Sequence, residues 1–298
     1  MNALEIKDVC KNYGDFKALD QINFEIEEGS FVGLLGVNGA GKTSLISSIA
    51  GINNFKGSIK VMGYDVIREV VKAKMALGVV PQELAFDPFL TVYQTLKFQS
   101  GLYGITNNKE WIDEILERLY LKDKVNSKTR SLSGGMKRRL MVAQALVHKP
   151  PLIILDEPTA GVDVEIRKGL WDFISELHKN GHTILLTTHY LEEVEKLCDK
   201  IIMINAGKII AKSSKDELIN QASHLPTLGQ IEIYGGEINE ELKQMLISYD
   251  NHVLTFSLDN SDQLLSILNL LKLSNIKIGC IQINRPSLEE IFINYLHR

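Results

Sequence analysis

The segment of residues 36–43 reads GVNGAGKT and matches the pattern G-x-x-x-x-G-K-[ST]. An apolar run at 31–35 precedes it and a stretch with helical character at 43–50 follows, so the order is strand, glycine loop, helix. Such a loop lets backbone N–H groups close around phosphate oxygens, and the helix presents its positive end to the same anion. Lys42 would bridge the terminal phosphates and Thr43 would supply a hydroxyl to Mg²⁺. This segment, the phosphate loop, predicts a nucleoside triphosphate site.

A second element with reactive groups is the acidic end of an apolar run. Residues 152–157 read LIILDE, a strand-like run that closes with two adjacent carboxylates. Taken alone, this pattern is also typical of a solvated strand end. Beside a phosphate loop it indicates that Asp156 holds Mg²⁺ through water and that Glu157 acts on the attacking water as general base. The two segments together predict phosphoryl transfer to water.

A second glycine loop, residues 132–136, reads LSGGM and runs directly into a helix-forming stretch. The Ser133 hydroxyl and the amides near Gly134 and Gly135 are therefore expected at a helix N-terminus, which favours an anion. Since the phosphate loop already surrounds the phosphates from one side, we expect this second loop to approach from elsewhere, and a second copy of the chain is one source.

Composition narrows the class of protein. The chain has 298 residues, 45% of them hydrophobic and 23% charged, which is typical of a globular protein with a sizeable core. The net charge of −4 argues against nucleic acid as the main partner, and we expect the basic run 137–139 to be a solvated helix face. The longest apolar runs are strand-sized and the N-terminus lacks the core of a signal peptide, so any membrane role would need a partner. Three cysteines outside any C-x-x-C pattern are interpreted as buried thiols of a reducing compartment, the cytoplasm: Cys10, Cys198 and Cys280.

The periodicity predicts an α/β fold with two domains. Strand patterns at 21–26, 31–35, 152–155 and 183–187 alternate with helical patterns at 43–50, 165–179 and 191–198, which predicts a mainly parallel sheet flanked by helices. Helical patterns at 110–121 and 137–147 predict a helical insert over about 83–148. A polar stretch from Ser213 to Gly229 is interpreted as a linker. The predicted domains are 1–222 and 223–298, the second built from strands at 230–234, 252–258 and 276–283 and helices at 240–249 and 261–273.

With these motifs in this order, the chain resembles the ABC ATPases over roughly residues 1–212. Tyr13 stands where that family stacks an aromatic ring on adenine. Gln82, in VVPQE, matches the glutamine that contacts Mg²⁺ and links the sheet to the helical insert. Asp163 ends TAGVD, which resembles the loop across the dimer interface. His189, in LLTTHY, matches the switch histidine at the γ-phosphate.

The resemblance implies a P-loop NTPase fold of the ABC type, with a parallel sheet, an antiparallel β subdomain and a helical insert, followed here by a small α+β domain. It implies that Glu157, His189 and Lys42 are catalytic and that Thr43, Gln82 and Asp156 hold Mg²⁺. Two copies would sandwich two ATP molecules and drive separate transmembrane permease subunits from the cytoplasmic face of the inner membrane. The ATP-binding residues it implies are Tyr13, Gly36, Val37, Asn38, Gly39, Ala40, Gly41, Lys42, Thr43, Ser44, Gln82, Ser133, Gly134, Gly135 and Asp163.

Two positions depart from the family pattern. Met136 stands where glutamine is usual and Val37 where proline is usual, and neither change removes a phosphate, metal or water ligand. Methionine at that position, the wording GVDVEIR and the ending PSLEEIFINYL resemble bacterial drug and polysaccharide exporters. The sequence therefore predicts an exporter.

Three other classes stay open at this stage. A soluble ABC ATPase acting on ribosomes or DNA normally has two ATPase domains or a long coiled coil between the phosphate loop and the acidic strand, and this chain has neither. A P-loop GTPase would carry an N-K-x-D motif, which is missing from the sequence. A nucleotide-binding regulator without turnover is disfavoured by the presence of Lys42, Asp156, Glu157 and His189.

Overall fold

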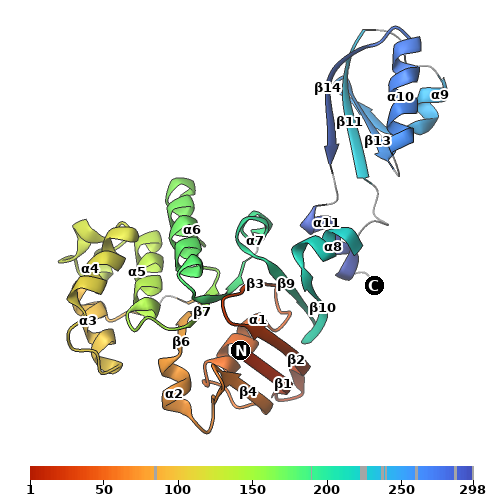
Figure 1. The fold of residues 1–298 in the computed structure, drawn as a ribbon. Helices are drawn as coiled ribbons and strands as arrows, with labels where there is room; N and C mark the ends of the chain where they lie inside the picture. The colour runs from red at the N-terminus through yellow and green to blue at the C-terminus, as the bar shows by residue number, and fades with distance from the viewer. Residues whose placement is uncertain are drawn as a thin grey trace. The chain divides into compact units, whose positions relative to one another are not determined.

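The computed structural model describes residues 1–83, 86–188, 190–221, 227–235, 238, 240–258, 261–284 and 287–296. The chain forms two compact units, residues 1–215 and 216–298. The boundary that the sequence predicted, between residues 222 and 223, lies outside the described residues. Figure 1 shows the course of the chain, and each unit is described by itself below.

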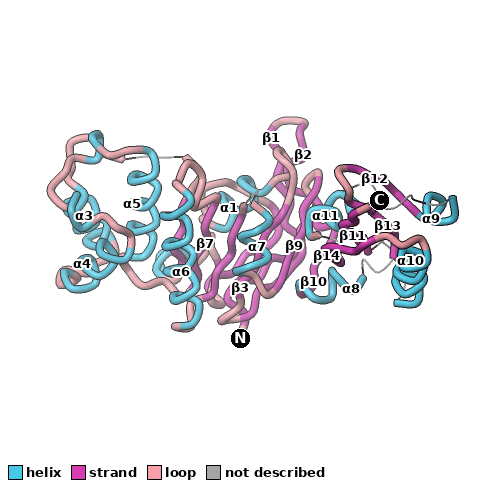
Figure 2. The backbone as a smooth tube through the Cα atoms, turned by 90° about the horizontal axis from the view of Figure 1, so that it is seen from above, coloured by secondary structure: helices cyan, strands magenta, loops and turns pink. Residues whose placement is uncertain are grey.

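The central sheet of the first unit has six strands: β3 (Phe31–Leu35), β6 (Leu77–Val80), β7 (Leu152–Asp156), β8 (Thr183–Thr187), β9 (Lys200–Asn205) and β10 (Lys208–Ser214). Their order is β10-β9-β3-β8-β7-β6, and all pairs are parallel except β10 with β9. Every residue of β3, β7 and β8 is buried, as expected for continuous apolar runs inside a parallel sheet. Figure 2 shows β7, β3 and β9 of this sheet, and β8 lies between β3 and β7. The prediction of a mainly parallel sheet is confirmed.

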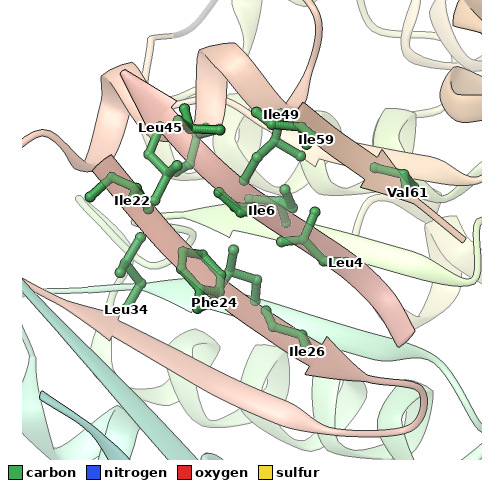
Figure 3. Close-up of a cluster of buried hydrophobic side chains, with 14 of the residues drawn as sticks. Leu4, Ile6, Ile22, Phe24, Ile26, Leu34, Leu45, Ile49, Ile59 and Val61 are labelled. Carbon is green, nitrogen blue, oxygen red and sulfur yellow. The ribbon is translucent and has the colours of Figure 1, made fainter. Parts of the chain in front are cut away.

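A second, antiparallel sheet of the same unit packs against helix α1 (Lys42–Ile49). Its strands are β1 (Asn2–Tyr13), β2 (Phe16–Glu27), β4 (Lys56–Val61) and β5 (Tyr64–Asp65), in the order β2-β1-β4-β5. Alternating residues of β2 point inward, and Ile22, Phe24 and Ile26 join Leu45 and Ile49 of α1 in one apolar core (Figure 3). This core fixes the start of α1, and with it the phosphate loop, against the antiparallel sheet.

The remaining helices of the first unit are α2 (Val70–Met75), α3 (Val92–Leu102), α4 (Lys109–Arg118), α5 (Gly134–Leu146), α6 (Val164–Lys179) and α7 (Leu191–Leu197). Helices α3, α4 and α5 lie in the predicted helical insert, together with the short 3₁₀ segments Lys122–Lys124 and Thr129–Ser131. Helix α3 was not predicted, although Thr91 and Gln94 form a capping box at its start. In this part of the chain the structure adds one helix to the two that periodicity predicted.

The second unit has the sheet order β12-β13-β11-β14, all antiparallel, from β11 (Thr227–Tyr234), β12 (Leu246–Asp250), β13 (Val253–Leu258) and β14 (Lys277–Asn284). Helix α8 (Lys215–Gln221) begins at the boundary between the units, and α9 (Glu240–Met245), α10 (Ser261–Leu273) and α11 (Leu288–Leu296) follow in the second unit. An apolar core that includes Ile231, Leu254 and Phe256 holds the sheet to α10. The prediction of a small α+β domain is confirmed.

Two predictions for the end of the chain were wrong in detail. The predicted helix 240–249 ends at Met245, and residues 246–250 form β12, because pairing with β13 overrides the local helical pattern. The stretch from Ser213 to Gly229 is not a plain linker, since it contains the end of β10, helix α8 and the first residues of β11. Ser223 and Pro226, which motivated that prediction, lie outside the described residues.

The cysteines also differ from expectation. Cys198 is buried, whereas Cys10 is partly buried and Cys280 is exposed, so the interpretation of three buried thiols was wrong for two of them. Cys280 lies in β14, which is the edge strand of its sheet in the part of the chain that the structure describes. Among the described residues, no helix has the length and apolar character that a membrane span requires.

Candidate functional site: a phosphate loop and an acidic strand end

A cavity of about 400 Å³ opens where β3 and β7 end and α1 begins. Because the carboxyl ends of parallel strands meet at one edge of a sheet, segments far apart in the sequence come together there. The cavity brings together residues of the phosphate loop, Gln82 and both acidic residues. Its lining residues are Phe16, Ala18, Asn38, Gly39, Ala40, Gly41, Lys42, Thr43, Ser44, Gln82, Asp156 and Glu157.

Glycines shape the phosphate loop for close approach of the backbone. A Cβ atom on Gly36 would lie 2.6 Å from the carbonyl oxygen of Ile204. Gly41 has φ +109°, and a Cβ there would lie 2.7 Å from the carbonyl oxygen of Ala18. Both positions therefore require glycine. Gly36 and Val37, although in the loop, are not among the cavity-lining residues.

The ammonium group of Lys42 is held inside its own loop. Its Nζ donates to the carbonyl oxygens of Gly36, at 2.6 Å, and Val37, at 3.2 Å. Burial lowers the pKa of Lys42, against the opposing attraction of Glu157 and Asp156. A polyanion in the cavity would supply the counter-charge that two neutral carbonyls do not.

Asp156 is a buried carboxylate, 2% exposed, with one oxygen engaged and one free of hydrogen bonds. The Thr187 hydroxyl donates to Oδ1, and Oδ2 has no hydrogen-bond partner in the structure. Burial raises the pKa of Asp156, while the hydrogen bond from Thr187 and the nearby cations Arg138 and Lys42 oppose that rise. An unpartnered carboxylate oxygen beside the hydroxyl of Thr43 and the amide of Gln82 offers the all-oxygen ligands that Mg²⁺ prefers. The donor set fits this metal.

Glu157 follows with an uncommon backbone conformation. Its φ is +50°, in the left-handed region that costs energy for a residue with a side chain. Its amide donates to the carbonyl oxygen of Thr187 at 2.9 Å. This turn carries the chain out of β7 and leaves Glu157 at the cavity wall.

The basic run 137–139 is not a solvated face, and that prediction was wrong. Arg138 and Arg139 are 3% and 4% exposed. Arg139 Nη1 donates to the carbonyl oxygens of Leu119, at 2.7 Å, and Tyr120, at 3.1 Å. Backbone carbonyls around both guanidinium groups replace water, which permits their burial. Sequence reasoning missed these contacts because they come from segments distant in the chain.

The aromatic residue at the cavity is Phe16, which sequence reasoning missed. Tyr13, the predicted adenine-stacking residue, is 47% exposed and is not among the lining residues. Its hydroxyl accepts a hydrogen bond from Asn53 Nδ2 at 2.8 Å, and Lys11 Nζ lies 4.7 Å from its ring centre. Tyr13 and Phe16 are paired across the tight turn between β1 and β2. The sequence signal that could have found Phe16 is the Gly14-Asp15 turn, because it places residues 13 and 16 opposite each other.

The second glycine loop lies outside this cavity. Ser133 is the N-cap of α5, where its hydroxyl accepts a hydrogen bond from the amide of Met136 at 3.3 Å, and both Ser133 and Gly134 are exposed. The position a Cβ would take on Gly135 lies 3.3 Å from the carbonyl oxygen of Gly161, so this loop adjoins the segment that leads to Asp163. Asp163 is the N-cap residue of α6. None of these residues lines the cavity at the phosphate loop, and His189 lies outside the described residues.

A parallel sheet with a phosphate loop and an acidic strand end at one edge is the architecture of P-loop nucleotide-binding proteins. Comparison with known proteins narrows this class. The family model described as "ABC transporter" matches residues 19–160. A solved structure of an ATP-binding subunit of an ABC transporter superposes with a TM-score of 0.70 at 29% identity, covering 74% of this chain and 92% of the other.

Curated relatives agree with that class. The linearmycin resistance ATP-binding protein of Bacillus subtilis is 36% identical over 309 residues, covering 99% of this chain and 98% of the relative. The Nod factor export ATP-binding protein I of Rhizobium etli is 39% identical over 243 residues, covering 80% and 76%. A daunorubicin resistance ATP-binding protein of Streptomyces coeruleorubidus is 33% identical over 302 residues, covering 98% and 95%. The chain belongs to the ABC transporter family, as an ATP-binding and ATP-hydrolysing subunit of the exporter type.

Proposed function

We propose that this subunit powers export by a separate transmembrane permease, to which it docks from the cytoplasmic face of the plasma membrane. Two observations support the division of labour. No described helix qualifies as a membrane span, and the relatives that align over nearly the whole chain are named ATP-binding proteins of resistance systems. The permease would contact the subunit beside Gln82, where the sheet meets the helical insert, and would select the cargo.

Within one subunit, the cavity residues divide the chemistry among them. The loop amides and Lys42 bind the β- and γ-phosphates, and Thr43, Gln82 and Asp156 hold Mg²⁺. The metal, when bound, supplies positive charge against the phosphates. Glu157 accepts a proton from the attacking water, and His189 steadies the γ-phosphate. The unpartnered Oδ2 of Asp156 is the observation that carries this assignment, because a buried carboxylate oxygen at a phosphate loop calls for a cation or its water.

In a pair of subunits, each ATP binds between the two copies and holds them together. Ser133 and Gly134 are exposed and do not line the cavity of their own chain, which supports the assignment of the ATP they bind to a second copy. The segment ending at Asp163 adjoins this second glycine loop and lies in the same interface. Hydrolysis replaces the bridging anion with ADP and phosphate and loosens the pair, which biases a closed-to-open equilibrium that the permease converts into alternating access.

The test is the Glu157→Gln variant, which keeps the size of the side chain and removes the base. ATP turnover, measured as phosphate release, should fall by about 10²–10⁴-fold. Dimers dependent on Mg·ATP should remain visible by size-exclusion chromatography, because the binding residues are intact. Glu192→Gln, at an exposed position of α7 in a 3.3 Å ion pair with Lys196, serves as the control and should keep wild-type turnover. A Glu157→Gln protein that hydrolyses ATP at the wild-type rate would refute the role of Glu157.

A further inference from the structure

Arg138 of helix α5 lies buried between the two strand ends that lead into the site. Its Nη1 donates to the carbonyl oxygens of Pro81, at 2.5 Å, and Gln82, at 3.0 Å. Its Nε and Nη2 donate to the carbonyl oxygen of Glu157, at 3.0 Å and 2.5 Å, and Nη2 also donates to that of Asp156. One side chain thus binds four carbonyls from two segments.

Three of these carbonyls lie just after β6 or β7, and the fourth belongs to Asp156, the last residue of β7. The two strands pair in parallel up to Val80 and Leu155, and the carbonyls lie at or just beyond the end of that pairing. A planar guanidinium with donors on three nitrogens can satisfy such a ring of acceptors, whereas an ammonium group is a single point with three donors. Arg138 therefore continues, through its side chain, the cross-link between strands that the backbone no longer makes.

The carbonyl of Glu157 is the one that receives two of these hydrogen bonds. Glu157 has the left-handed φ of +50°, which persists only where the surroundings over-determine it. Thr187 holds its amide through a 2.9 Å hydrogen bond, and Arg138 holds its carbonyl. The direction in which the Glu157 side chain leaves the backbone depends on both.

We propose that Arg138 is a positioning residue for ATP hydrolysis, which fixes the backbones of Gln82 and Glu157 to helix α5, whose N-cap residue is Ser133. The inference rests on the roles proposed above for Gln82 and Glu157. Arg138 touches neither nucleotide nor metal in this assignment, because the cavity-lining residues do not include it. Its effect is on the geometry of the hydrolytic step, and ATP binding by the phosphate loop stays independent of it.

The neighbouring Arg139 provides a matched control. It lies on the same helix, is buried to the same extent, and also donates to two backbone carbonyls. Those carbonyls belong to Leu119 and Tyr120, at the end of α4, and not to either strand end of the site. Loss of Arg139 leaves the same kind of buried defect without a link to Gln82 or Glu157.

The experiment compares Arg138→Met, Arg139→Met and Glu157→Gln in the full-length chain, at a temperature where each is folded by circular dichroism. The Kd for ATP and the kcat for phosphate release are measured separately. Arg138→Met should lower kcat about 10–100-fold and leave the Kd for ATP within about two-fold. Arg139→Met should keep kcat within about two-fold of wild type. Equal kcat in the Arg138 and Arg139 variants, or a parallel loss of ATP affinity in Arg138→Met, overturns the proposal.

If Arg138→Met does not fold, Arg138→Lys replaces it, since lysine keeps the charge and loses the planar fork. A folded Arg138→Lys protein with kcat lowered at least about five-fold and an unchanged Kd supports the proposal, and wild-type kcat overturns it. The Glu157→Gln arm separates the two ideas. Wild-type turnover in Glu157→Gln refutes the proposed role of Glu157, whereas an inactive Glu157→Gln beside a fully active Arg138→Met refutes the positioning role alone.

Discussion

The two units of this chain differ in the kind of side chain that they bury. Among the residues that the structure describes, every buried polar or charged side chain belongs to residues 1–215, including Arg138, Asp156 and Glu193. The core of the second unit, around Ile231 and Phe256, is built from apolar side chains. Burial of a polar group is unfavourable unless hydrogen bonds replace water. Oδ2 of Asp156 has no hydrogen-bond partner, so burial of this side chain is less favourable than burial of the apolar side chains of the second unit.

The difference follows from what each unit has to hold in place. In the first unit, several of the buried polar contacts, such as Thr187 with Asp156 and Arg138 with Glu157, lie at the ends of strands, where segments from different parts of the chain meet. Glu193 is an example: it is fully buried, accepts hydrogen bonds from the Thr159 hydroxyl and from Trp171 Nε1, and ties α7 to the segment after Glu157. Apolar packing alone does not fix a backbone direction, whereas hydrogen bonds do. This contrast predicts different responses of ATP turnover to substitutions in the two units.

The largest loss of activity is expected from Lys42→Ala. Lys42 supplies the positive charge of the phosphate loop, and charge-assisted hydrogen bonds contribute about 1.5–3 kcal/mol each. We expect the Kd for ATP to rise at least about 10-fold and turnover to become undetectable. Lys243→Ala in the second unit, which removes a surface ion pair with Glu240, should leave both unchanged. Unaltered ATP affinity in Lys42→Ala would contradict the assignment of the phosphate loop as the ATP site. It would also contradict the expected difference between the two units.

Asp156→Asn is expected to abolish Mg²⁺-dependent turnover while stabilising the nucleotide-free protein. Burial raises the pKa of Asp156 above that of the unfolded chain, so its charged form is less stable in the fold. The stability it contributes is present below the unfolded pKa and lost as pH rises through the folded pKa. Without nucleotide at pH 7, we expect the variant to have a higher Tm than wild type. The increase should be about 2–4 °C for each kcal/mol that removal of the buried charge adds to the free energy of unfolding.

The raised pKa of Asp156 also predicts how the stability of Asp156→Asn depends on pH. Because protonation of Asp156 removes the buried charge, the difference in Tm between the variant and wild type should shrink as pH falls toward about 4. Thermal melts at several pH values test this directly. A variant that melts below wild type at pH 7 would show that the charge of Asp156 is favourable in the fold, and the contrast between the units would lose its clearest case.

Some of this architecture could be predicted from the sequence because the signal was local. The strands Phe31–Leu35 and Thr183–Thr187 and the helix Ser261–Leu273 were predicted with the bounds that the structure shows, since uninterrupted apolar runs and helical periodicity are properties of the segment itself. The phosphate loop can also be recognised from the sequence, because it requires lysine and glycine at a fixed spacing. What these segments have in common is independence from distant neighbours.

The features that sequence reasoning missed depend on contacts between distant segments. Burial of Arg138 requires backbone carbonyls from two strand ends. The residues next to Arg138 in the sequence do not indicate that these carbonyls lie nearby. Phe16 reaches the cavity through the register of a hairpin, and β12 exists because β13 pairs with it. Periodicity describes one segment at a time, so these three features could not follow from it.

The smallest effect on turnover is expected from a cavity in the core of the second unit. Ile231 and Ile154 are both fully buried strand isoleucines, and replacing either by alanine should cost about 2–5 kcal/mol of stability. Ile154 lies in β7, the strand that ends at Asp156, so Ile154→Ala should lower turnover as well as Tm. The side chain of Ile231 packs among residues of the second unit, so Ile231→Ala should lower the melting transition of that unit and leave kcat within about two-fold of wild type. Calorimetry and phosphate release on the same samples test this pair of variants. If Ile231→Ala lowered kcat as much as Ile154→Ala did, the second unit would have to take part in the geometry of hydrolysis. An apolar core would then not mark a unit as separate from catalysis.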